Sequence, residues 1–168
     1  MYRLDKNHWD ACSDALKCIE EKNIKTLEEA WEKCEFGDWM MWLYVHLHPN
    51  HIRERVLVAG LCANTVRHLM KDVRSIAAVD AAIAFGEGKI SEHELKIAAA
   101  DAANTDIYCS ICYTAFAAAS SYGDIDYAVD ASYVAASYVA TPYDKSDLIK
   151  EKQLKTAEIC RKYLHPVF

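Results

Sequence analysis

Residues 37–47 read Gly-Asp-Trp-Met-Met-Trp-Leu-Tyr-Val-His-Leu, and this stretch decides the fold class. After Asp38 nearly every side chain is apolar or aromatic, so a helix formed here is apolar on all of its faces. Asp38 is a residue type that caps helix N-termini through its carboxylate. We therefore expect a helix from Trp39 to about Leu47 that lies at the centre of an all-α fold and is covered on every side.

The segments around this stretch also predict helices. After Pro49, Asn50 can begin a long helix to about Lys71, whose middle, residues 56–63, is fully apolar and contains Gly60, which permits close approach of another backbone. The expected helices are 8–22, 26–34, 39–47, 50–71, 74–85, 92–122, 125–140 and 146–164. Their ends follow from the Thr26/Glu29 and Ser91/Glu94 capping boxes, from Asp124 as an N-cap, and from Gly37, Gly86 and Gly123 as C-terminal caps.

Breakers and linkers are scarce along the whole chain. Three prolines and five glycines in 168 residues are too few for a turn-rich β-fold. Nineteen of the residues from 75 to 143 are alanine, the strongest helix former, which also lets helices approach closely. The sequence therefore predicts one all-α domain, residues 1–168, built as a helical bundle of about seven or eight helices with an alanine-rich half.

Charge and apolar patterning argue against several classes of protein. A formal net charge of −6 disfavours general binding of nucleic acid, which needs a basic surface. The apolar run 56–63 is too short to span a bilayer, and the first ten residues carry no apolar run typical of a secretory signal. Seven cysteines without a compact framework predict reduced thiols. We expect a cytoplasmic protein with no membrane partner.

Several segments together resemble a known family. They are Leu-Glu-Glu-Ala-Trp at 27–31, Cys-Glu-Phe-Gly-Asp-Trp-Met-Met-Trp-Leu at 34–43, Gly-Glu-Gly at 86–88 and Ala-Glu-Ile-Cys-Arg-Lys-Tyr-Leu at 157–164. The chain is similar in these segments to the alanine-rich, all-helical immunity proteins of bacteria and their phages. Many members carry a basic residue where Phe36 stands here. The resemblance implies protection against a toxin or other effector by binding, and it implies no catalytic residues.

The tryptophans of the opening stretch are the first candidate site. Trp39 and Trp42 lie three residues apart, on one face of a helix, and could form an aromatic wall for a base or for a side chain of a partner. In the alternative interpretation, Asp38 is a helix cap and both rings fill the core, which the apolar character of the whole helix favours.

Histidines and cysteines form two further patterns. His46, His48 and His51 could bind a transition metal, but no accompanying metal motif supports this, and histidines also suit the C-terminal end of a helix. Cys109-x-x-Cys112 lies inside a predicted helix, where buried packing is favoured over redox or zinc chemistry. We expect neither a metal nor a cofactor.

Acidic residues interrupt the alanine-rich helices at Asp80, Asp101 and Asp130. Because an unpaired carboxylate is costly in an apolar helix, they are expected to pair with arginine or tyrosine side chains inside the bundle. Alternatively, they line a polar pocket whose other walls are Tyr108, Tyr127 and Tyr133. Without a nucleophile, a phosphate loop or a metal motif, catalysis is not expected.

Positive charge gathers in one segment, since residues 46–74 hold five lysines and arginines against two acids. This group could be a solvated face, or it could clamp an acidic toxin surface or the phosphates of a nucleotide. Its members are Arg53, Arg55, Arg67 and Arg74, with His51 and His68.

With the resemblance, these residues predict a non-enzymatic inhibitor: an immunity protein that binds and neutralises a protein toxin or defence effector. The alternative is a phage-encoded anti-defence sponge that sequesters a nucleotide-derived immune signalling molecule, using aromatic walls for the base and arginines for phosphate. Either function is compatible with a homo-oligomer.

Overall fold

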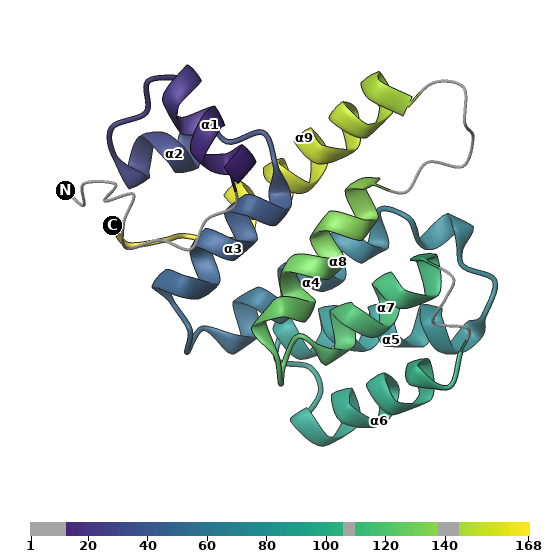
Figure 1. Ribbon diagram of the computed structural model, residues 1–168. Coiled ribbons are helices and arrows are strands. Elements are labelled where there is room, and N and C mark those ends of the chain that lie inside the picture. The colour runs from purple at the N-terminus through teal and green to yellow at the C-terminus, as the bar shows by residue number, and fades with distance from the viewer. Residues whose placement is uncertain (1–12, 106–109, 138–144) are drawn as a thin grey trace.

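The computed structural model describes residues 13–105, 110–137 and 145–168, and within them it contains nine α-helices, one short 3-10 helix and no β-strand (Figure 1). The α-helices are α1 (Ser13–Glu21), α2 (Leu27–Lys33), α3 (Gly37–Leu47), α4 (Ile52–Asn64), α5 (Val73–Gly86), α6 (Glu92–Ala103), α7 (Ser110–Ser120), α8 (Ile125–Ser137) and α9 (Lys145–Tyr163), with the 3-10 helix η1 (Arg67–Leu69) after α4. The all-α class is confirmed, with slightly more helices than the seven or eight expected.

Helix α4 occupies the centre of the bundle. It packs against α5, α7, α8 and α9, and its side chains Val56, Val58, Ala59 and Cys62 are fully buried. Helix α3 packs mainly against α8 and α9 and buries one face, which contains Met40, Met41, Tyr44 and Val45. The prediction that α3 is covered on every side is therefore wrong. An apolar composition on all faces does not require neighbours on all faces, since among the described residues His46 of α3 is exposed and Trp39 and Trp42 are half-buried.

Glycines mark the places where helices touch most closely. A Cβ atom added at Gly60 of α4 would lie 3.0 Å from Ala82 Cβ of α5, so the close approach expected at Gly60 is present. At Gly86 the added atom would lie 2.4 Å from Leu57 Cβ, which is closer than real Cβ contacts allow. Gly86 thus serves the α4–α5 contact, and the left-handed residue that closes α5 is Gly88, with φ 76°. The C-terminal cap predicted at Gly86 is two residues too early.

Gly37 also differs from its prediction. It does not cap the preceding helix but is the first residue of α3, and it is buried. Thr156 of α9 fills the space where its side chain would stand, with the threonine Oγ1 2.4 Å from the position of an added Cβ. The Cys160 thiol also donates to the Gly37 carbonyl oxygen at 3.4 Å. The glycine is therefore a contact between α3 and α9.

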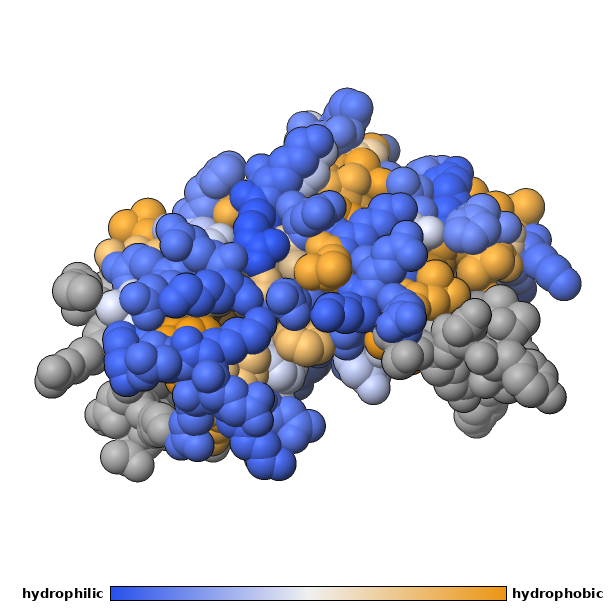
Figure 2. All heavy atoms as spheres, turned by 90° about the horizontal axis from the view of Figure 1, so that it is seen from above, coloured by the Kyte–Doolittle hydropathy of each residue, from blue (hydrophilic) through white to orange (hydrophobic). Residues whose placement is uncertain are grey.

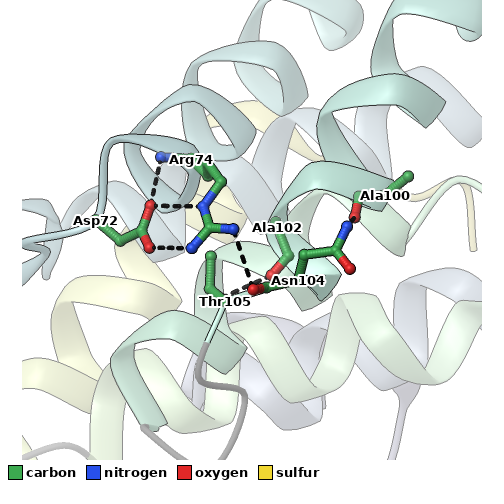
Figure 3. A network of polar contacts seen from close by, with 6 residues as sticks. All are labelled: Asp72, Arg74, Ala100, Ala102, Asn104 and Thr105. Carbon is green, nitrogen blue, oxygen red and sulfur yellow. Dashed lines mark hydrogen bonds and ion pairs between the residues drawn. The ribbon is translucent and has the colours of Figure 1, made fainter.

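The single helix expected over residues 92–122 is two helices, α6 and α7, and the break follows Ala103. Side chains compete with the helix there, because Asn104 Nδ2 donates to the Ala100 carbonyl and Thr105 Oγ1 donates to the Ala102 carbonyl. Figure 3 shows that Arg74 reaches from α5 to the carbonyl oxygen of Asn104, at 3.1 Å, while it also binds Asp72. This network holds the end of α6 against the start of α5.

Local caps explain most other helix ends. The hydroxyl of Thr26 accepts from the backbone N–H of Glu29, Ser91 and Glu94 form a complete capping box, and Asp124 accepts from the N–H of Asp126, as the sequence predicts. The helix expected over residues 50–71 begins instead at Ile52, with His51 as its N-cap residue, and ends at Asn64, before the separate 3-10 helix η1.

Seen from above, the surface of the protein has no single dominant apolar area (Figure 2). Figure 2 shows a mainly polar face on which small apolar areas are separated by polar side chains. None of the helices in the described ranges combines the length and the apolar character that crossing a bilayer requires.

Candidate functional site

The outer face of α3 carries a row of aromatic side chains. Phe36, Trp39 and Trp42 are half-buried and His46 is exposed, whereas the opposite face of the helix lies in the core. Spacings of three and four residues place these side chains along one side of the helix. The row follows the helix for about 15 Å, given a rise of 1.5 Å per residue.

The rings in this row pack against each other in two tilted pairs. The rings of Phe36 and Trp39 have centroids 4.2 Å apart and planes tilted by 32°. The rings of Trp42 and His46 are also 4.2 Å apart, tilted by 36°, and His46 Nδ1 lies 2.8 Å from the Trp42 carbonyl oxygen. The ring contacts and this polar contact limit the freedom of the side chains. We call Phe36, Trp39, Trp42 and His46 the aromatic face.

Asp38 supports this face from within the helix. The helix begins at Gly37 with Phe36 as its N-cap residue, so Asp38 lies in the first turn and is not the cap that was predicted. Burial raises the pKa of Asp38, and hydrogen bonds from the backbone N–H groups of Asp38 and Trp39 act in the opposite direction. A carboxylate at this position complements the helix dipole. The residue is thus part of the helix start, and its side chain is half-buried.

Arg55 is a structural residue. Only 5% of it is exposed, and its guanidinium donates to three carbonyl oxygens, those of Ser121 (2.9 Å), Pro49 (2.8 Å) and Tyr122 (2.8 Å). Burial lowers its pKa, but these acceptors hold the charged group in place. The guanidinium therefore fixes the end of α7 to α4.

The other candidate arginines also have partners in the protein. Arg53 lies over the Phe85 ring, 4.5 Å from its centroid, and donates to the Phe85 carbonyl oxygen. Arg67 forms a two-pronged ion pair with Asp80, with Nη2 2.9 Å from Oδ2. The hydrogen bond from this pair raises the pKa of Arg67. Each of these arginines is thus already engaged by a different residue of α5.

The three aspartates of the alanine-rich half lie apart and have different surroundings. Asp80 and Asp101 are exposed, so the expectation that they lie inside the bundle is wrong for both. Asp130 is half-buried and accepts a hydrogen bond of 2.5 Å from the Tyr113 hydroxyl, whose pKa is raised by burial and by this bond. Arginine and tyrosine partners are thus found, but at separate places. Tyr108 and Cys109 lie outside the described residues.

The histidine motif divides between two sides of α3. His46 belongs to the aromatic face, while His48 and His51 stack on each other with ring centroids 4.9 Å apart. Within the described ranges, no group of three or more His, Cys, Asp or Glu side chains is placed to hold a metal ion.

The buried thiols are not activated nucleophiles. Burial raises the pKa of Cys34 to about 11, and a hydrogen bond with Cys62 together with burial raises the pKa of Cys160. Both groups are therefore protonated thiols near neutral pH, and a thiolate is the form that attacks or binds metals.

Comparison with known protein families, with curated proteins and with solved structures yields no match to this chain.

Sequence reasoning missed two features of the site. Phe36 belongs to the aromatic face, and its position three residues before Trp39 was a usable signal, since residues at that spacing share a helix side. The Tyr113–Asp130 contact joins two helices and has no local signature.

Proposed function

We propose that the chain is a non-enzymatic binding protein of a bacterial or phage conflict system, an immunity protein that neutralises a protein toxin or defence effector. The observation that carries the proposal is the aromatic face of α3, where two tilted ring pairs stay partly accessible on a helix whose other side is core. The segment that bears this face is also the most specific part of the resemblance to immunity proteins.

Aromatic side chains suit a protein partner for a physical reason. Tryptophan and tyrosine supply large contact areas at low entropic cost and are enriched among residues that dominate binding energy. Rings that already pack against each other lose little further freedom on binding. An interface centred on α3 would need to bury on the order of 800 Å² on this side, which requires neighbouring residues around the aromatic face.

The arginine contacts weigh against the sponge alternative. Phosphate capture needs guanidinium groups free to form two-pronged hydrogen bonds. Here Arg55 is held by three carbonyl oxygens and Arg67 by Asp80, so a nucleotide would have to displace existing partners. Catalysis by a cysteine nucleophile also lacks support. The pKa values of Cys34 and Cys160 are raised, which disfavours the reactive thiolate form.

Native mass spectrometry of the chain isolated from cells that produce it tests the proposal. We expect a stoichiometric protein to be retained by the parent chain and lost by the double variant Trp39→Ala/Trp42→Ala. Tyr133→Ala removes an aromatic ring that is 52% exposed on α8 and is the matched control, which should keep the partner.

A retained small molecule, or a thermal shift with linear or cyclic nucleotides that corresponds to roughly 2.7 kcal/mol at a hundredfold excess over Kd, would instead establish the sponge. Retention of the protein partner by the double variant would exclude the aromatic face as the binding surface.

A further inference from the structure

We propose that residues 164–168 form a proton-sensitive latch, which is docked on α3 while His48 is neutral and is released when His48 gains a second proton. The inference is independent of the proposed function, because it concerns the side of α3 that faces away from Trp42.

The latch segment follows α9 and runs back past α3 toward α2 (yellow in Figure 1). Leu164 is 1% exposed and anchors its start in the core. Farther along, the Phe168 ring lies 6.3 Å from the ring of Trp31 on α2. Between these two contacts, the side chain of Val167 is exposed. The backbone N–H of this residue makes the polar contact that closes the latch.

That contact fixes the protonation state of His48. The backbone N–H of Val167 donates to His48 Nε2 at 3.1 Å. Because Nε2 accepts this bond, it carries no hydrogen, and the single proton of the neutral ring is on Nδ1. A second proton would have to occupy Nε2, where it would point at the N–H of Val167. Protonation therefore converts the closing hydrogen bond into a repulsive contact between two donors.

The surroundings of His48 also oppose a positive charge. Burial, followed by the neighbouring His51 ring, lowers the pKa of His48, and Glu54 of α4 acts weakly in the opposite direction. The Tyr44 hydroxyl of α3 lies 2.9 Å from His51 Nδ1, and burial raises the pKa of this phenol to about 12, so it stays neutral. In the latch segment itself, the titratable side chain is His165, which is exposed.

The sign of the pH dependence follows from this direction. A released His48 titrates near the ordinary value of 6.5, whereas the docked ring titrates lower. At a pH between these two pKa values, His48 binds more protons in the released state than in the docked state. A falling pH therefore favours release. Docking is therefore strongest above about pH 7.5 and weakens as pH falls through 6.5. Between high pH and pH 5.5, the equilibrium constant for docking can fall by up to about tenfold. This limit applies when the released His48 has a pKa of about 6.5 and the docked His48 stays neutral.

Amide hydrogen exchange by NMR tests the latch on the full chain. We expect the protection factor of the Val167 amide to fall by up to about tenfold between pH 7.5 and pH 5.5, after correction for intrinsic exchange, while amides of α4 keep theirs. His48→Gln retains an acceptor oxygen at the end of its side chain but does not titrate, so its Val167 protection should be independent of pH. His93→Gln, at an exposed position on α6, is the matched control, and its Val167 protection should change with pH as in the parent.

Two results would overturn the proposal. One is constant Val167 protection in the parent chain across this pH range, and the other is an unchanged pH dependence in His48→Gln. If His48→Gln does not fold, the titration of His48 in the parent decides, since a pKa at or above 6.5 contradicts the latch.

Discussion

Helices α3 and α4 both come from strongly apolar segments, yet they occupy different positions in the bundle. Helix α4 has small residues, Ala59, Gly60 and Ala63, where neighbours approach, and it is surrounded by four helices. Helix α3 carries tryptophans on its outer side and has two principal neighbours. Apolar composition alone therefore does not distinguish a central helix from a helix at the edge of the bundle. The two helices differ instead in the size of the side chains on their faces. Small residues let other helices pack closely on α4, whereas the larger rings on the outer side of α3 are half-buried.

The largest expected effect compares the two faces of α3. Tyr44→Ala should lower the free energy of unfolding by about 3–5 kcal/mol, because it removes a buried ring and leaves a cavity. Trp42→Ala should cost about 1 kcal/mol, since its ring is half-buried. Urea unfolding of both variants measures the difference. If Trp42→Ala lowers the free energy of unfolding as much as Tyr44→Ala does, the Trp42 ring is a core residue. That result would remove the support for the aromatic face as a binding surface.

The next effect compares two arginines of α4. Arg55→Met should cost about 3 kcal/mol, because three carbonyl oxygens lose their donor and each orphaned buried acceptor costs roughly 1–3 kcal/mol. Arg53→Met is the matched change on the exposed side and should cost below about 1 kcal/mol. Denaturant midpoints of the two variants provide the measurement. Equal costs would show that the guanidinium of Arg55 does not fix α7 to α4.

The smallest effect concerns the approach of α5 to α4. Gly86→Ala places a Cβ atom 2.4 Å from Leu57 Cβ, and overpacking of this kind costs about 1–3 kcal/mol despite the better helix propensity of alanine. Gly123→Ala meets nothing closer than 3.9 Å and should leave the melting temperature nearly unchanged. A stable Gly86→Ala variant would mean that the two helices can separate without loss.

Local signals in the sequence predicted much of this fold. The Thr26, Ser91 and Asp124 caps depend on neighbouring residues only, so their helix starts were predictable. The break at Asn104 was missed because alanines on one side and apolar residues on the other favour a continuous helix. What holds it in place is Arg74, thirty residues away in the sequence.

The site was less predictable than the fold. Trp39 and Trp42 could be identified as a pair from their spacing, but their exposure depends on which helices cover α3. Arg55 and Arg67 bind partners in other parts of the chain, Ser121 and Asp80. The sequence therefore showed a cluster of positive charge but not that each arginine binds a different partner.

The contact of Gly37 with Thr156 and Cys160 has a consequence for the order of folding. Helix α3 cannot reach its final position until the region around residue 156, far along the chain, has been synthesised and formed into α9. Contacts between such distant residues form late and slow the search for the native state. During synthesis, α3, which contains Met40 and Met41, therefore lacks one of its two principal neighbours, and apolar surface that is exposed in this way favours aggregation.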